Sequence, residues 1–173
     1  MISNCALAAR YVPARAVRHG YKTDLLRWKA DICPTADYQP APLRVFQINK
    51  SKPRTLVCHD MAGGYHEDSF IDGIDNVDGF RIFHWAYIDI FVYFSHHLVT
   101  IPPIGWIDAG HRNGVSVLGT FITEWKTGSE ICEQLFGSKD SAENTATQLT
   151  LIAATLNYDG WLINIENEVS VSF

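Results

Sequence analysis

The chain has 173 residues, of which 47% are hydrophobic and 12% aromatic, so it can build one globular domain around a sizeable core. Its formal net charge is −5 and its basic residues are scattered. This pattern argues against nucleic-acid binding, which needs a basic stripe for phosphate contacts. No apolar run approaches the roughly 20 residues of a membrane-spanning helix, so no membrane association is expected.

Residues 1–50 are predicted to be an N-terminal extension and a segment that precedes the main domain. Arg10, Pro13 and Arg15 interrupt any apolar core of signal-peptide type, although the Ala- and Arg-rich opening also fits a transit peptide. The cysteines have irregular spacing and include no CxxC, which predicts free thiols in a reducing compartment; they are Cys5, Cys33, Cys58 and Cys132. The expected location is the cytosol.

The first elements expected along the chain are a short amphipathic piece around Leu25, Leu26 and Trp28 and an extended, proline-rich connection up to Pro42. Four strands are expected further on, because each of these runs is short, apolar and rich in β-formers; they are Thr55–Cys58, Ile88–Ser95, Val115–Ile122 and Asp159–Ile165.

Two helices are predicted between these strands. Pro102 and Pro103 begin the first and Gly114 ends it, which is the usual placement of Pro at a helix start and Gly past its end. Asp140 and Glu143 resemble a capping box at the start of the second. Its apolar stripe comprises Ala142, Ala146, Leu149, Ile152, Ala153 and Leu156.

Strands separated by helices of this length form parallel βαβ units, so the fold class is α/β. No GxGxxG follows the first strand, and Gly63-Gly64 is interpreted as a turn, which argues against a doubly wound dinucleotide fold. We therefore predict an incomplete (β/α)8 TIM barrel over residues 51–173. These residues would form its N-terminal half, which is roughly the first four β/α units.

The segment DGWLINIEN, residues 159–167, indicates a buried strand that is apolar on both faces and carries two polar side chains near its end. Asn164 and Glu166 are two residues apart, so both point to the same side of the strand. In α/β proteins, ligands bind at the C-terminal edge of the strands. One interpretation is a catalytic pair; the other is a buried strand that simply emerges into water.

Five separated segments together resemble glycoside hydrolase family 85, in the family's order and over most of the chain. They are LVCHDMAGGY (56–65), HWAYIDIFVYFSHH (84–97), IPPIGW (101–106), VLGTFITEW (117–125) and DGWLINIEN (159–167). The resemblance implies a (β/α)8 barrel without a cofactor that cuts the GlcNAc-β-1,4-GlcNAc bond in N-linked glycans or free oligosaccharides. It implies that Glu166 is the general acid/base and that Asn164 holds and polarises the 2-acetamido group of the substrate.

The residue types agree with that chemistry. A substrate-assisted glycosidase uses the acetamide oxygen of its substrate as nucleophile, so it needs one carboxyl group and one neutral hydrogen-bonding group. The expected course is a retaining hydrolysis through an oxazoline, which contributes to cytosolic deglycosylation.

Further residues lie next to the ends of the predicted strands. Trp85 and Trp125 are predicted to stack on sugar rings or else to pack in the core. Glu124 is a second polar contact or a solvated loop carboxylate. His59, Asp60 and His96 either line the site or support it from behind. The sequence contains no HExxH and no clustered His/Cys spacing, so no metal site is predicted. It contains no GxSxG, so no serine nucleophile is predicted either.

The family barrel continues beyond its Asn-x-Glu strand, whereas this sequence ends at Phe173. We therefore expect unpaired edges on the first and the fourth predicted strand. Two functional hypotheses follow from the resemblance: an active endo-β-N-acetylglucosaminidase, or a catalytically inactive truncated form or fragment of one that is at most a weak glycan binder.

Overall fold

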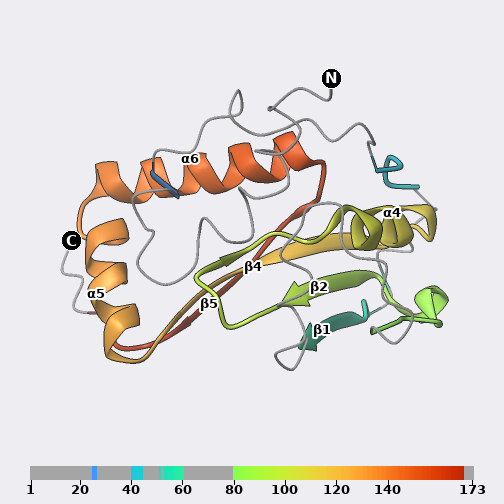
Figure 1. Ribbon diagram of the computed structural model, residues 1–173, viewed down its shortest axis with the longest axis horizontal. Helices are drawn as coiled ribbons and strands as arrows, with labels where there is room; N and C mark the ends of the chain where they lie inside the picture. Colours follow the sequence, from blue (N-terminus) through green and yellow to red (C-terminus); the bar gives the residue numbers. More distant parts are fainter. Residues whose placement is uncertain (1–24, 27–39, 45–50, 52, 61–79, 170–173) are drawn as a thin grey trace, which may run out of the picture.

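A parallel sheet forms the centre of the computed structural model (Figure 1). The described residues are 25–26, 40–44, 51, 53–60 and 80–169. The parallel strands are β1 (Leu56–Asp60), β2 (Ile90–Phe94), β4 (Ser116–Glu124) and β5 (Gly160–Glu166). They pair in the order β1-β2-β4-β5, which confirms the predicted chain-order neighbours. The short strand β3 (Val99–Thr100) runs antiparallel to β4 and was not predicted.

In the described part of the chain, three helices connect the strands, and a 3-10 turn, η2 (Trp85–Tyr87), precedes β2. Helix α4 (Ile104–Arg112) confirms the predicted helix between Pro103 and Gly114. Helix α5 (Trp125–Phe136) was not predicted, and α6 (Lys139–Leu156) follows it directly. Among the described residues, no helix is both long and apolar enough to cross a membrane.

The N-terminus of α6 corrects one prediction. Ser138 is the N-cap. Its hydroxyl oxygen accepts from Ser141 N–H at 3.2 Å, and the Ser141 hydroxyl oxygen accepts from Ser138 N–H at 3.1 Å. The Asp140–Glu143 capping box was therefore wrong, because the helix begins one residue before Asp140. Glu143 instead lies 3.7 Å from Lys139, one turn before it.

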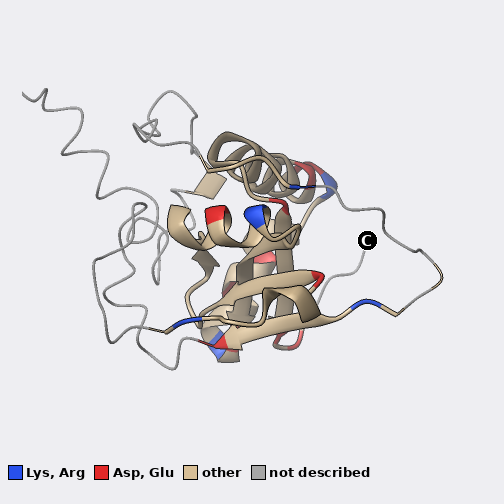
Figure 2. Ribbon diagram, turned by 90° about the vertical axis from the view of Figure 1, so that its right-hand side faces the viewer, with Lys and Arg blue, Asp and Glu red and all other residues tan. Residues whose placement is uncertain are grey.

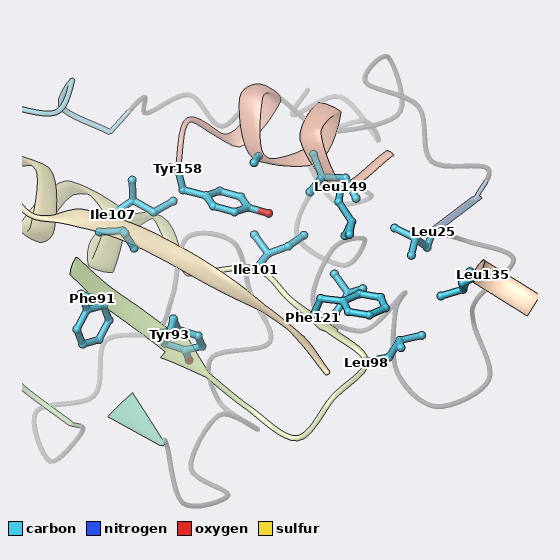
Figure 3. Packing of buried hydrophobic residues seen from close by; sticks show 14 of the residues in the cluster. Leu25, Phe91, Tyr93, Leu98, Ile101, Ile107, Phe121, Leu135, Leu149 and Tyr158 are labelled. Carbon is cyan, nitrogen blue, oxygen red and sulfur yellow. The ribbon is translucent and has the colours of Figure 1, made fainter. Parts of the chain in front are cut away.

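All three helices cover the same face of the sheet. A Cβ on Gly110 of α4 would lie 2.4 Å from Val117 Cγ2. Trp161 of β5 donates its indole N–H to Leu149 O of α6 at 2.8 Å. Alternation along the strands gives this face its buried side chains, among them Phe121, which is fully buried and lies across the core from Leu149 in Figure 3.

Strand β5 is less buried than its sequence predicts. Ile163 and Ile165 are 54% and 40% exposed, although the expectation was a strand apolar and buried on both faces. The reason is that, among the described residues, β5 pairs with β4 alone. Strand β1 likewise pairs with β2 alone among these residues.

Part of the predicted N-terminal extension contributes to the core. Leu25 is fully buried in the same hydrophobic cluster as the sheet residues (Figure 3). Ala41 donates its N–H to Asp108 Oδ1 at 3.0 Å and accepts from His111 Nδ1 at 2.7 Å, both on α4. Cys58 and Cys132 are free thiols, as predicted; the other two cysteines lie outside the described residues.

His111 connects α4 to the start of β5. It is 2% exposed, and its Nε2 lies 2.8 Å from Asp159 Oδ2, which also accepts from Val117 N–H at 2.7 Å. Both ring nitrogens of His111 thus face acceptors, so the doubly protonated ring satisfies both. Burial lowers the pKa of His111. The hydrogen bonds to Asp159 and to the backbone of Ala41, together with the negative charges of Asp159 and Asp108, outweigh burial and raise this pKa above 6.5.

We expect Gly110→Ala to destabilise the fold by about 1–3 kcal/mol, because the added Cβ would overlap Val117 and approach Val115 O at 3.3 Å. Gly105→Ala, in the same helix, is the matched control. Nothing lies within 4 Å of its Cβ position, so the change should add about 0.5–1 kcal/mol of helix stability. Urea unfolding of both variants measures the difference; equal effects would contradict the close approach of α4 to β4.

The His111 contribution to stability should depend on pH. A pKa raised on folding stabilises the protein fully below the unfolded value of 6.5, and this contribution disappears as pH rises through the folded pKa. The free energy of unfolding should therefore fall more steeply above about pH 6.5 in the wild type than in His111→Gln. Asp159→Asn, which keeps an oxygen for Val117 N–H but removes the charge, should weaken that fall. Parallel pH profiles for the wild type and His111→Gln would exclude this role.

Candidate active site

The C-terminal end of β5 brings an amide and a carboxyl group into contact. Asn164 Nδ2 donates to Glu166 Oε1 at 2.8 Å, so both side chains lie on the same side of the strand, as predicted. Asn164 is half-buried and Glu166 is exposed. Because a carboxylate only accepts, the amide nitrogen faces Glu166 and the amide oxygen of Asn164 remains available for a donor.

The neighbouring strands add polar groups at the same edge. Glu124, the last residue of β4, is in register with Glu166, so both carboxyl groups point to the same face. His96, just after β2, places Nδ1 3.2 Å from both carboxyl oxygens of Glu124 and Nε2 3.9 Å from Asp60 Oδ2 at the end of β1. We call Asp60, His96, Glu124, Asn164 and Glu166 the candidate edge.

Trp125 follows Glu124 directly and is the first residue of α5. Its φ is +60°, a left-handed conformation that is a genuine outlier for a bulky side chain. Its side chain is 82% exposed, which excludes the alternative of core packing that the sequence left open. A strained backbone thus presents an aromatic ring to solvent directly after Glu124, and backbone outliers of this kind cluster at functional sites.

Two of the predicted site residues lie away from the candidate edge. Alternation places His59 on the helix-covered face, where its ring lies 5.4 Å from Phe80 and 6.0 Å from Trp106, centroid to centroid. Trp85 precedes β2, at the opposite end of the sheet, and packs edge-on against Phe91 at 5.3 Å. Its partial burial in this aromatic cluster supports the core-packing alternative.

The sequence did not indicate the support behind the candidate edge. Asn167 turns to the helix-covered face and donates to Cys132 Sγ of α5 at 3.6 Å. One signal was available: Gly128, Ile131, Cys132 and Leu135 recur at helical spacing and are the buried residues of α5. The glycine and the threonine-serine pair around it weaken that pattern as a helix signal.

The candidate edge thus offers two exposed carboxyl groups, Asp60 and Glu166, one amide and a third carboxyl group, Glu124, that is hydrogen-bonded to His96. This set can donate a proton, accept one and orient a polar substrate group. In the part of the chain that the structure describes, no group of three or more His, Cys, Asp and Glu side chains is placed to hold a metal ion. On the elements that the structure describes, Lys and Arg are interspersed with Asp and Glu and form no basic stripe (Figure 2).

The acid and amide groups lie at the C-terminal edge of a parallel sheet, where α/β barrel enzymes place their active sites. Residues 65–172 match the sequence model of Glycosyl hydrolase family 85. Because this match spans more than half of the 173 residues, the chain belongs to glycosyl hydrolase family 85. It is therefore a member of a family of glycosidases.

Similar proteins occur in animals and plants. The chain is 49% identical over 158 residues to cytosolic endo-beta-N-acetylglucosaminidase of Gallus gallus and 47% identical over 152 residues to that of Homo sapiens. It is 55% identical over 119 residues to cytosolic endo-beta-N-acetylglucosaminidase 2 of Arabidopsis thaliana. The alignments cover 86%, 86% and 69% of this chain but 21%, 20% and 17% of those proteins. The chain thus spans about a fifth of the length of the curated relatives that it matches.

The fold also resembles a solved structure, the glycoside hydrolase domain of Endo-D from Streptococcus pneumoniae R6. The TM-score is 0.65 at 22% sequence identity, and the match covers 91% of this chain and 26% of that chain. At this identity the likeness concerns the fold, and it supports an α/β architecture with a parallel sheet.

The strain at Trp125 predicts an unusual order of stabilities. Trp125→Gly should be more stable than Trp125→Ala by about 1 kcal/mol, because a left-handed φ costs a residue with a Cβ roughly that amount. The ring itself is 82% exposed, so both variants lose little burial. Chemical denaturation of the two variants measures the difference. At Thr127, a control position inside α5, the glycine variant should be the less stable one.

Proposed function

We propose that this chain carries the catalytic acid/base of an endo-β-N-acetylglucosaminidase that hydrolyses the GlcNAc-β-1,4-GlcNAc bond in the core of N-linked glycans or free oligosaccharides. The observation that carries this proposal is the hydrogen-bonded Asn164–Glu166 pair on one face of the C-terminal end of β5. Membership of glycosyl hydrolase family 85 and the relatives' names support the substrate class. Those names also support a cytosolic location and a part in deglycosylation.

The geometry suits substrate assistance. With its N–H on Glu166, Asn164 can accept the N–H of the 2-acetamido group through its amide oxygen. This bond increases electron density on the acetamide oxygen, which attacks the anomeric carbon while Glu166 gives its proton to the departing glycosidic oxygen. A protonated oxazoline forms, which keeps the acetamide N–H bonded to Asn164, and the second GlcNAc leaves with the proton from Glu166.

The second half of the reaction uses the same residues. Glu166, now a carboxylate, takes a proton from water as the water oxygen attacks the anomeric carbon and reopens the oxazoline. Two displacements at the same carbon retain its configuration. An acceptor sugar in place of water gives transfer instead of hydrolysis, so transfer is a side reaction of the same site.

Trp125 and Glu124 have binding roles in this proposal. The exposed ring of Trp125 offers a flat aromatic surface to the C–H face of a sugar. Glu124, fixed by His96, accepts hydrogen bonds from sugar hydroxyls. The sheet order β1-β2-β4-β5, with helices on one face, supports a (β/α)8 barrel whose inner face carries these groups.

The two residues of the pair should fail in different ways. Glu166→Gln should abolish hydrolysis of a labelled glycopeptide with an intact GlcNAc–GlcNAc core, because no group is left to protonate the leaving oxygen. Asn164→Ala should lower the rate by on the order of 10²–10³, the value of one positioned hydrogen bond in a transition state. A preformed sugar oxazoline bypasses the ring-forming step that Asn164 assists, so Asn164→Ala should still use it as a donor.

These measurements require the complete gene product and a matched control. Glu143→Gln makes the same chemical change on the exposed face of α6, away from the candidate edge, and should keep the wild-type rate. Full hydrolytic activity in Asn164→Ala would exclude substrate assistance by this residue. Turnover in Glu166→Gln close to the wild-type rate would overturn the assignment of the acid.

A further inference from the structure

A small polar network lies directly behind the candidate edge, on the helix-covered face. Thr123 precedes Glu124 and Asn167 follows Glu166, so alternation turns both side chains away from the proposed substrate side. Thr123 Oγ1 lies 3.1 Å from Cys132 Sγ, and Asn167 Nδ2 donates to the same sulfur at 3.6 Å. The Cys132 thiol therefore connects Thr123, the residue before Glu124, to Asn167, the residue after Glu166.

The network is buried and closely packed. Cys132 is fully buried and Thr123 is 2% exposed. A Cβ on Gly128 would lie 2.6 Å from Asn167 Oδ1 and 2.9 Å from the carbonyl carbon of Thr123. Since backbone atoms cannot move aside, α5 comes this close to the strand ends only because residue 128 is glycine.

Two further bonds fix the chain just after β5. Ser129 Oγ of α5 donates to Glu168 O at 2.9 Å, and Asn167 Nδ2 also donates to Glu168 O at 3.0 Å. The β4–β5 ladder ends at the Glu124–Glu166 pair, so beyond this pair the contacts of Glu168 with Ser129 and of Asn167 with Cys132 hold the chain against α5. Strand ends without such contacts open locally at little cost in free energy.

We propose that Asn167, Cys132 and Thr123 form a positioning network that holds Glu166 and Glu124 at a fixed separation. The inference rests on the proposed function of Glu166 and adds residues that touch no substrate. Release of Asn167 would let the end of β5 move relative to β4, and a displacement of about 1 Å can cost about 10²-fold in rate.

The test compares Asn167→Ala and Cys132→Ala with Cys132→Ser in the complete gene product. The two alanine variants should lower kcat about 10- to 100-fold and change KM less than about twofold, because orientation and not binding is lost. Serine keeps a hydrogen-bonding group in nearly the same place, so Cys132→Ser should stay within about threefold of the wild-type kcat.

Thr145→Ala is the control for stability alone. Its hydroxyl is buried between α5 and α6, where it donates to Leu135 O at 3.2 Å and to Ser141 O at 2.8 Å. The loss of these bonds should lower Tm without changing kcat. Alanine variants at Asn167 and Cys132 whose kcat equals that of Thr145→Ala would overturn the positioning role.

A second readout needs no turnover. In protein labelled with 15N-asparagine, the side-chain amide signal of Asn164 should report its bond to Glu166 and should shift in Asn167→Ala and Cys132→Ala but not in Thr145→Ala. An unchanged Asn164 signal overturns the positioning role whatever the rates are. A shifted signal in a protein whose wild type shows no turnover overturns the proposed reaction and leaves the positioning role supported.

Discussion

The parallel pairing of β4 with β5 is the constraint on which the rest of the candidate edge depends. Seven residue pairs, from Leu118–Gly160 to Glu124–Glu166, fix the register of these strands. A slip of one residue would turn every side chain of one strand to the other face. The same register that buries Phe121 against the helices therefore places Glu166 beside Glu124. Core packing and site geometry thus depend on the same strand register.

The helix-covered face sets this register and the open face carries the chemistry. The approach of α4 at Gly110 and of α5 at Gly128 leaves no room for a Cβ, so the helices can sit against the sheet in one place only. At the other end of the strands, His111 and Asp159 hold α4 to the start of β5 through a partly buried hydrogen bond. The ladder is thus held at both ends, while the opposite face carries the polar side chains of the candidate edge at its C-terminal end.

Sequence patterns predicted much of this, and the failures have physical causes. Asn164 and Glu166 were predicted because alternation leaves a strand only two directions. The ends of the four strands were close to the observed ones since apolar runs mark them. Helix α5 was missed because Gly128 lies on its buried stripe, where close approach to Thr123 outweighs helix propensity. The sequence left the roles of His59 and Trp85 open because a position near a strand does not specify which face or which end a side chain occupies.

Trp125 shows why local rules fail most at a site. No propensity predicts a tryptophan with φ of +60°, since the conformation costs free energy and the exposed ring returns little by burial. Trp125 lies at the junction where β4 ends and α5 turns back over the sheet. A glycine at this junction would make the turn at lower cost but would place no ring beside Glu124. Such a local cost, directly after a carboxyl group that the ladder already fixes, fits the binding role proposed for Trp125.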